Sequence, residues 1–442
     1  MHFACNVQVM SLRIAICCLA TLPAVAFSAP APAPVLAPVL DLAGLSTEIA
    51  ACTDFDGYVN GKWRAATAIP ADKARIGSFD GLRDESRRIV QDTLVEAARQ
   101  PERLDTPGKR LAADYYASGM DLPSIEKRGL TSLAPLLSQI DALNERARLP
   151  ALLAKMALYR IPAPISVSVR PDDKDKRRYI LALDQSGLGL PDRDDYFRDD
   201  ARTLDLRKAY AAYRSRFAQL SAGDVGAPMA DAVFALETDF ARASLTRVER
   251  RDPNVVYNLH TVESLAKLAP GFDWAAYLSG LGVARTAEFN VTSPKFAQQV
   301  ARAAAEAPLA VWRAYLRQHV LSAAAPALPA AYVNAHFDYR SRAIRGLEAP
   351  PPRAEQVIVH VTGNFGSEPL AEGLGQLYVA RAFSPEAKAR AVAMTEDIKA
   401  ALRARIQKLD WMSTPTKVRA IGKLDATVLK IGFPDRWKRM RV

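Results

Sequence analysis

Apolar residues recur every three or four positions along most of this chain, the spacing that places them on one face of an α-helix. The stretch 79–97 follows this pattern, with Ser78 predicted as its N-cap. The pattern returns in 385–409, which Ser384 can cap, and again after Ser413. Because this period dominates the chain, we predict a mainly α-helical fold.

One segment breaks the helical period. Ile165, Val167 and Val169 alternate with polar residues, 171–176 has the composition of a turn, and 179–183 is a second short apolar stretch. Alternation with a period of two residues is typical of a half-buried strand. We therefore predict one small β-hairpin within the helical protein.

The charge of the chain is high but dispersed. Among 442 residues, 49% are hydrophobic and 24% charged, as in ordinary soluble proteins, and the length allows two or three domain-sized cores. The formal net charge is +11, yet basic residues alternate with acids in segments such as 83–85 and 193–195. This favours solvated helix faces over nucleic-acid contacts, which use clustered Lys and Arg with aromatic residues. A basic protein that binds nucleic acid or a membrane surface remains an alternative.

The N-terminus has the features of a signal peptide, which we place at 1–28. Arg13 supplies a positive charge, 14–27 is apolar, and small residues near its end are spaced for cleavage. Met10 is an alternative start, and a retained membrane anchor is an alternative fate. The following segment, 29–51, is a Pro/Ala-rich linker. We predict a periplasmic or secreted protein with no stable membrane span after cleavage.

Cleavage would remove Cys5, Cys17 and Cys18 and leave Cys52 as the single cysteine. In an oxidising compartment, a single cysteine is either a free thiol or one whose partner is missing.

The residues themselves show no complete catalytic centre. No two histidines have the spacing of the His-Glu-x-x-His zinc motif, and the pair His260 and Glu263 is interpreted as a surface pair. There is no G-x-S-x-G nucleophile elbow and no phosphate-binding glycine loop, and Cys52 has no evident catalytic partner. The five histidines are His2, His260, His319, His336 and His360.

Two further groups of residues are interpreted as structural. The acidic pairs at 172–173 and 194–195 lie in loop-like stretches and are predicted to be solvated. Aromatic residues within apolar helical stretches are predicted to lie in the core. These are Trp63, Trp274, Trp312, Trp411 and Tyr378.

Four collinear segments resemble the neprilysin family of zinc metallopeptidases, which includes endothelin-converting enzymes and bacterial oligopeptidases. They are DFDGYVNGKW with AIPADKARIGSFDGLRDE (54–63 and 68–85), LGLPDRDDYF (188–197), LGQLYVARAF (374–383), and WMSTPTKVRAIGKL through IGFPDRW (411–437). The resemblance covers nearly all of the chain after the linker. It implies a large multi-helix lobe with a small β-hairpin, lacking most of the thermolysin-like catalytic lobe, and places this domain at 52–442.

The chain departs from the family pattern at Asp56-Gly57, at Asp195 and in 357–373, the stretch before Leu374, which matches poorly. Gly57 stands near the position of a family aromatic residue, and Asp195 stands where the family has a second tyrosine. Asn334-Ala335-His336-Phe337 is similar to the family's Asn-Ala-aromatic substrate motif, but it lies too early in the chain. We interpret that match as fortuitous.

The resemblance implies zinc-dependent endopeptidase or oligopeptidase activity on short peptides, at the amino side of hydrophobic residues. In the family, the His-Glu-x-x-His motif and a later glutamate hold the zinc, and all of these would lie beyond Val442. We therefore expect no catalytic residues and no metal ligands in this chain, no zinc bound by it, and no activity by itself. A separately encoded catalytic half is a candidate partner. In family members with disulfides, the partner of the cysteine matching Cys52 lies near the C-terminus.

The resemblance also implies a substrate-binding group. Arg75 matches the family arginine that reaches the C-terminal carboxylate of a bound peptide, and Asp80 and Arg83 match residues of the same subsite. A guanidinium can hold a carboxylate with two parallel hydrogen bonds. The structural alternative is that Asp80 and Arg83 form an ordinary ion pair three residues apart on a helix. The functional alternative is a non-catalytic periplasmic module that binds peptides or a partner protein.

Overall fold

The computed structural model describes residues 42–161, 164–221, 227–283, 288–362 and 369–438. The predicted signal peptide and the first part of the linker lie outside the described residues, as do His2, Cys5, Cys17 and Cys18. The chain divides at Ala68 into two compact units.

The first unit contains a short 3₁₀ turn, η1 (Leu42–Gly44), and the helix α1 (Phe55–Ala66). The Asp54 side chain caps α1 by accepting a hydrogen bond from the Gly57 backbone N–H at 2.8 Å. A Cβ atom at Gly57 would lie 2.3 Å from Asp54 Oδ2, so the close cap explains a glycine at this departure from the family pattern. Cys52 is an exposed free thiol.

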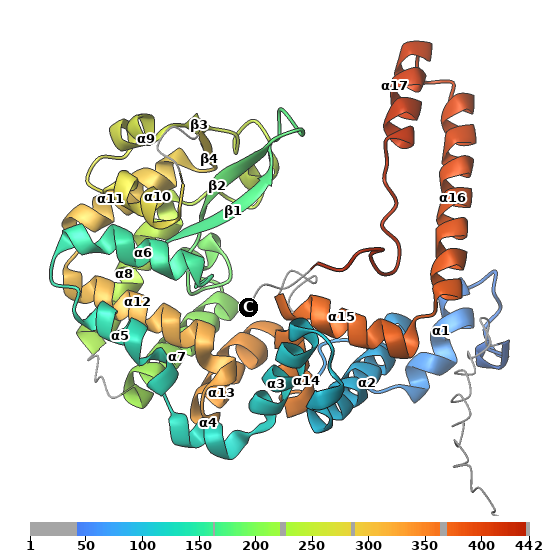
Figure 1. The fold of residues 1–442 in the computed structure, drawn as a ribbon, viewed down its shortest axis with the longest axis horizontal. Helices are drawn as coiled ribbons and strands as arrows, with labels where there is room; N and C mark the ends of the chain where they lie inside the picture. The colour runs from blue at the N-terminus through green and yellow to red at the C-terminus, as the bar shows by residue number, and fades with distance from the viewer. Residues whose placement is uncertain (1–41, 162–163, 222–226, 284–287, 363–368, 439–442) are drawn as a thin grey trace, which may run out of the picture. The chain divides into compact units, whose positions relative to one another are not determined.

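The second unit is mainly helical, which confirms the predicted fold class (Figure 1). Its α-helices are α2 (Ser78–Arg99), α3 (Pro107–Met120), α4 (Leu122–Arg128), α5 (Ala134–Asp141), α6 (Leu149–Leu158), α7 (Ala201–Leu220), α8 (Ala227–Ala243), α9 (Val262–Leu268), α10 (Trp274–Gly280), α11 (Pro294–Glu306), α12 (Leu309–Ala324), α13 (Ala330–Phe337), α14 (Arg353–Thr362), α15 (Pro369–Ala382), α16 (Pro385–Lys408) and α17 (Thr414–Asp425). A π-helical turn, η8 (Asp338–Ala343), follows α13. None of the described helices is both long and apolar enough to cross a bilayer.

Two of the three predicted N-caps are confirmed. Ser384 accepts a hydrogen bond from the Ala387 N–H, and Ser413 accepts one from the Thr416 N–H. The prediction for α2 is wrong by one residue, because the helix already begins at Ser78 and Gly77 occupies the N-cap position.

The predicted hairpin is confirmed, but it belongs to a larger sheet. Strands β1 (Ile165–Pro171) and β2 (Tyr179–Gln185) pair antiparallel. Strand β4 (Phe289–Val291) adds to β2 in parallel, and β3 (Leu259–His260) pairs antiparallel with β4, so the strand order is β1-β2-β4-β3. Strands β3 and β4 were not predicted, because strands of two and three residues are too short to show an alternating pattern.

The interpretation of the acidic pairs as solvated holds for the exposed Asp173 but is wrong for Asp172 and incomplete for Asp195. The Asp172 carboxylate is buried in the β1–β2 turn, and hydrogen bonds from the Lys174 N–H, Arg178 Nε and the Tyr257 hydroxyl lower its pKa to about 2. Asp195 accepts a hydrogen bond from the Asp192 N–H at 3.0 Å and completes a capping box. The departure from the family pattern at Asp195 therefore has a local structural role.

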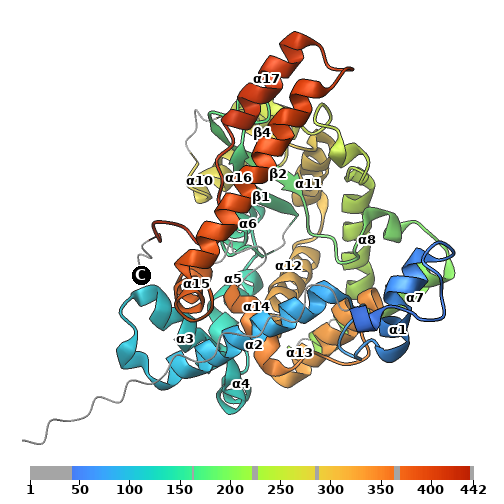
Figure 2. The ribbon, with the colours of Figure 1, turned by 90° about the vertical axis from the view of Figure 1, so that its right-hand side faces the viewer.

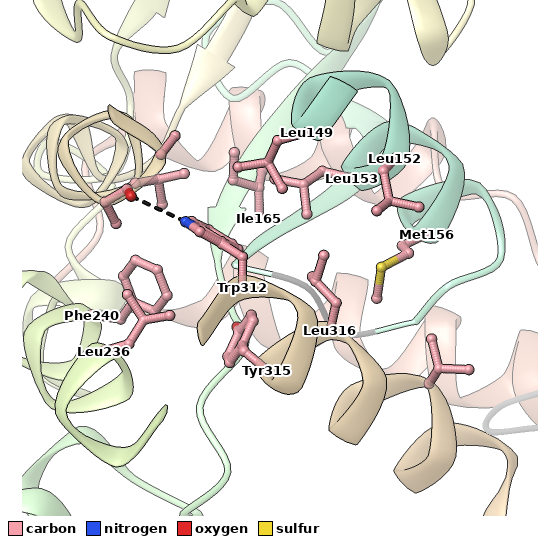
Figure 3. Packing of buried hydrophobic residues seen from close by; sticks show 14 of the residues in the cluster. Leu149, Leu152, Leu153, Met156, Ile165, Leu236, Phe240, Trp312, Tyr315 and Leu316 are labelled. Atoms are coloured by element: carbon pink, nitrogen blue, oxygen red, sulfur yellow. Dashed lines mark hydrogen bonds between the residues drawn. The ribbon is translucent and has the colours of Figure 1, made fainter. Parts of the chain in front are cut away.

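The main hydrophobic core lies among α5–α13 and the sheet (Figure 3). Trp312 is fully buried there and donates an indole hydrogen bond to the Ala303 carbonyl at 3.1 Å. Trp274 is also buried, which confirms the prediction for these two residues. The prediction is wrong for Trp63 and Trp411, which are 42% and 74% exposed. Trp411 lies in the turn between α16 and α17, where no described element covers it.

A separate core joins α2, α3, α14 and α15 (Figure 1). Leu94, Tyr116, Val357 and Leu374 are buried in it. Gly373 permits close contact of α15 with α3, because a Cβ atom there would lie 2.1 Å from the Gly108 carbonyl oxygen. This packing places α2 and α14 next to each other.

The helices α16 and α17 pack side by side, with an ion pair between Arg403 and Asp425 (Figure 1). The predicted apolar stripe on α16 does form one helix face, but Met394, Ile398 and Leu402 on it are exposed. Within the described residues, Ile406 is the only residue of α16 that counts as buried, and it is still 9% exposed.

Candidate functional site

A cavity of about 530 Å³ brings together Arg75, Asp80 and Arg83, the three residues of the predicted substrate-binding group. Its wall is built from the segment before α2, the first turns of α2, the end of α13, η8 and one face of α14; α2, α13 and α14 lie together in Figure 2. All of these elements belong to the second unit. The volume falls within the range of small-ligand pockets.

Helix α2 presents a charged face to this cavity. Asp80, Arg83, Asp84 and Arg87 all line it. Their spacing of three and four residues places them on one side of the helix. The family resemblance identified only Asp80 and Arg83, although the same spacing pointed to Asp84 and Arg87.

Three cations of the cavity wall are paired with carboxylates of the same wall. Arg83 forms an ion pair with Asp80 at 2.9 Å, so the pair expected in the structural alternative is present. Lys73 pairs with Asp84. Arg87 pairs with Glu355 of α14 and links the two helices across the cavity.

Two guanidinium groups of the wall have no carboxylate partner within the described part of the chain. The Arg75 side chain forms neither an ion pair nor a hydrogen bond there, and it is exposed. Arg345 donates one hydrogen bond, from Nη2 to the Ser341 hydroxyl at 2.6 Å. These two groups are therefore free to bind an anion that enters the cavity.

His336, at the end of α13, contributes a neutral imidazole to the wall. Burial lowers its pKa to about 4, with further contributions from the nearby charges of Arg340, His360 and Arg345. Its Nδ1 lies 3.3 Å from the Tyr213 hydroxyl. The stretch 334–337 is helical, and His336 had no predicted role in a cavity. Nothing local in the sequence indicated that this helix end would face α2.

The described residues do not fit a zinc ion. No group of three or more His, Cys, Asp or Glu side chains within them is arranged to hold a metal. His319 is buried away from the cavity, and burial lowers its pKa to about 3. His260 is half-buried with Nδ1 3.1 Å from the Ser264 hydroxyl, and burial lowers its pKa as well. No chemical step through a metal can be derived from these residues.

Comparisons with known proteins agree with one another. Residues 51–434 match the profile of peptidase family M13. The chain is 26% identical to endothelin-converting enzyme-like 1 of Rattus norvegicus over 409 residues, covering 89% of this chain and 52% of that protein. It is 25% identical to endothelin-converting enzyme 1 of Cavia porcellus over 399 residues, covering 87% of this chain and 51% of that protein.

Solved structures show the same likeness. The zinc metalloprotease ZMP1 of Mycobacterium tuberculosis, in complex with an inhibitor, superposes with a TM-score of 0.80 at 32% identity, covering 90% of this chain and 60% of that one. PepO of Lactobacillus rhamnosis shares the fold, with a TM-score of 0.74 at 21% identity. The match covers 87% of this chain and 60% of that one. This chain spans about half the length of the endothelin-converting enzymes that it matches.

Proposed function

This chain belongs to peptidase family M13, a family of zinc metallopeptidases, and from that premise we propose that it is the helical, substrate-binding part of an exported metalloendopeptidase that acts on short peptides. Its cavity would hold the C-terminal part of a peptide. The predicted signal peptide supports a periplasmic or secreted location, and the dispersed charge argues against nucleic acid as a partner.

The observation that carries this proposal is the unpaired guanidinium of Arg75 in the cavity wall. The neighbouring cations Lys73, Arg83 and Arg87 are already paired with Asp84, Asp80 and Glu355. A peptide carboxylate entering the cavity would therefore find a cation at Arg75 that need not first break an internal ion pair. Arg83 and Asp80 would line the same subsite as a neutral, hydrogen-bonding pair.

A peptide with a free C-terminus is expected to bind about tenfold more tightly than the same peptide with a C-terminal amide, because a charge-assisted hydrogen bond to Arg75 is lost in the amide. The substitution Arg75→Gln should remove this difference by weakening the free acid alone. Isothermal titration calorimetry of both peptides against both proteins measures the effect.

Arg216→Gln is the matched control for this experiment. Arg216 is an exposed arginine of α7 outside the cavity wall, so its loss changes the net charge equally. Equal affinity of the wild-type protein for acid and amide would contradict the proposal. The proposal would also be contradicted if Arg216→Gln reduced the affinity difference between acid and amide as much as Arg75→Gln does, because the effect would then reflect only long-range charge.

We further propose that zinc and the residues that activate water are supplied from outside this chain. The printed sequence has no His-Glu-x-x-His motif, and the described residues hold no cluster of metal ligands. The purified chain is expected to leave a fluorescence-quenched hydrophobic peptide intact in the presence of zinc. Cleavage that a chelator abolishes would overturn this expectation.

A non-catalytic peptide-binding module is the second candidate, favoured by the combination of a ligand-sized cavity with no metal cluster among the described residues. Both candidates predict peptide binding. They differ when a catalytic half, such as that of a family relative, is added: the first predicts that cleavage appears and depends on Arg75, and the second predicts none.

A further inference from the structure

We propose that the cavity prefers peptides whose last residue is Asp or Glu, with Arg75 binding the terminal carboxylate and Arg345 binding the carboxylate of the last side chain. This inference rests on the proposed function, because it assumes that a peptide C-terminus enters the cavity. It assigns a role to Arg345, which neither the sequence motifs nor the family resemblance single out.

The charged side chains that line the cavity favour a ligand with two anionic groups. Five Lys and Arg side chains and four carboxylates line the cavity. Three of the cations and three of the carboxylates form ion pairs with each other. Arg75 and Arg345 are left over, and Asp72, the fourth acid, forms no ion pair within the described part of the chain.

The end of the cavity near Arg345 is more positive than the wall alone suggests. Arg340 stacks over the ring of Tyr339, with 5.5 Å between its guanidinium carbon and the ring centroid, and has no carboxylate partner among the described residues. Arg340 and Arg345 both disfavour protonation of His336, which lines the cavity. The wall itself has one more cation than carboxylates, and Arg340 adds a further positive charge behind it, which favours a ligand end that carries more than one carboxylate.

The position of Arg345 is held by the fold. It follows the π-helical turn η8, and its Nη2 donates to the hydroxyl of Ser341, a buried residue of that turn. This bond uses one nitrogen of the guanidinium and leaves Nε and Nη1 as donors for a carboxylate. A π-helical turn shifts the following side chains relative to a regular helix, and such turns are frequent at functional sites.

The test uses four versions of one short hydrophobic peptide: ending in Glu or Gln, each as the free acid and as the C-terminal amide. Their dissociation constants are measured by calorimetry with the wild-type full chain, Arg75→Gln, Arg345→Gln, and Arg216→Gln as the charge-matched control. In wild type we expect Glu to bind about tenfold more tightly than Gln. Arg345→Gln should abolish the Glu/Gln difference and keep the acid/amide difference, and Arg75→Gln should do the reverse.

The two proposals fail separately in this design. An absent acid/amide difference in wild type contradicts carboxylate binding at Arg75, whereas an absent Glu/Gln difference in wild type overturns the present inference, whatever the variants do. If Arg345→Gln weakens the binding of the Glu and Gln peptides equally, Arg345 supports the fold and does not contact the last side chain of the peptide. Arg345→Lys, which keeps the charge but not the fork of donors, should retain part of the Glu preference.

Discussion

Replacing Trp312 with alanine is expected to lower the free energy of unfolding by about 4 kcal/mol, the scale of a large aromatic deletion in a close-packed core. Trp312 is fully buried on α12 and contacts the rings of Phe240 and Tyr315 (Figure 3). The substitution removes these contacts and leaves the Ala303 carbonyl without its indole donor. Urea unfolding followed by circular dichroism measures the loss.

Trp411→Ala is the matched control, because the same atoms are deleted from a residue that is 74% exposed. Its cost should stay below about 1 kcal/mol, as for most surface substitutions. If the two variants lost equal stability, the burial assigned to Trp312 would be wrong. A large loss for Trp411 alone would show that this side chain is covered in solution.

Replacing Glu237 with alanine is expected to cost about 3 kcal/mol, since buried donors left without an acceptor each cost on the order of 1–3 kcal/mol. Glu237 is fully buried on α8 and accepts hydrogen bonds from the hydroxyls of Tyr210 at 2.7 Å and Tyr196 at 2.8 Å. The Tyr196 hydroxyl in turn accepts hydrogen bonds from the backbone N–H groups of Gly189 and Leu190. The network therefore holds the segment after β2 against the core.

The protonation of Glu237 provides a second readout. Burial raises the pKa of this carboxyl in the folded state, so between the unfolded and folded pKa values the folded protein binds more protons. Its contribution to stability is therefore fully present below the unfolded pKa and is lost as the pH rises through the folded pKa. Glu237→Gln, which resembles the protonated acid, should become more stable relative to wild type as the pH rises.

Asp239→Ala is the control on the same helix, because its exposed carboxylate forms a surface ion pair with Arg242. We expect a change below about 1 kcal/mol and no comparable pH dependence. Equal losses for Glu237→Ala and Asp239→Ala would contradict the structural role of the buried network.

The sequence predicted local structure well where one segment carries the whole signal. The helical period, the caps at Ser384 and Ser413 and the β1–β2 hairpin depend on neighbouring residues. The prediction failed where the deciding contact is distant: Trp411 was predicted to lie in the core, but no part of the described chain covers it. Gly57 and Asp195, departures from the family pattern, are explained by caps that only the coordinates display.

The candidate site was likewise predictable from the sequence only in part. The resemblance identified Arg75, Asp80 and Arg83, and helical spacing extends that face to Asp84 and Arg87. No local pattern could show that these charges would meet α14, because the partner of Arg87, Glu355, lies 268 residues later in the chain.

The sequence by itself determined the family, the helical class and the charged face of α2, because short-range periodicity and collinear motifs carry that information. Only the tertiary structure decided which cations remain free. Whether a guanidinium can bind a ligand depends on the carboxylates within reach of it. Packing of α2 against α14 pairs Arg87 with Glu355, whereas Arg75 and Arg345 have no carboxylate partner within the described part of the chain.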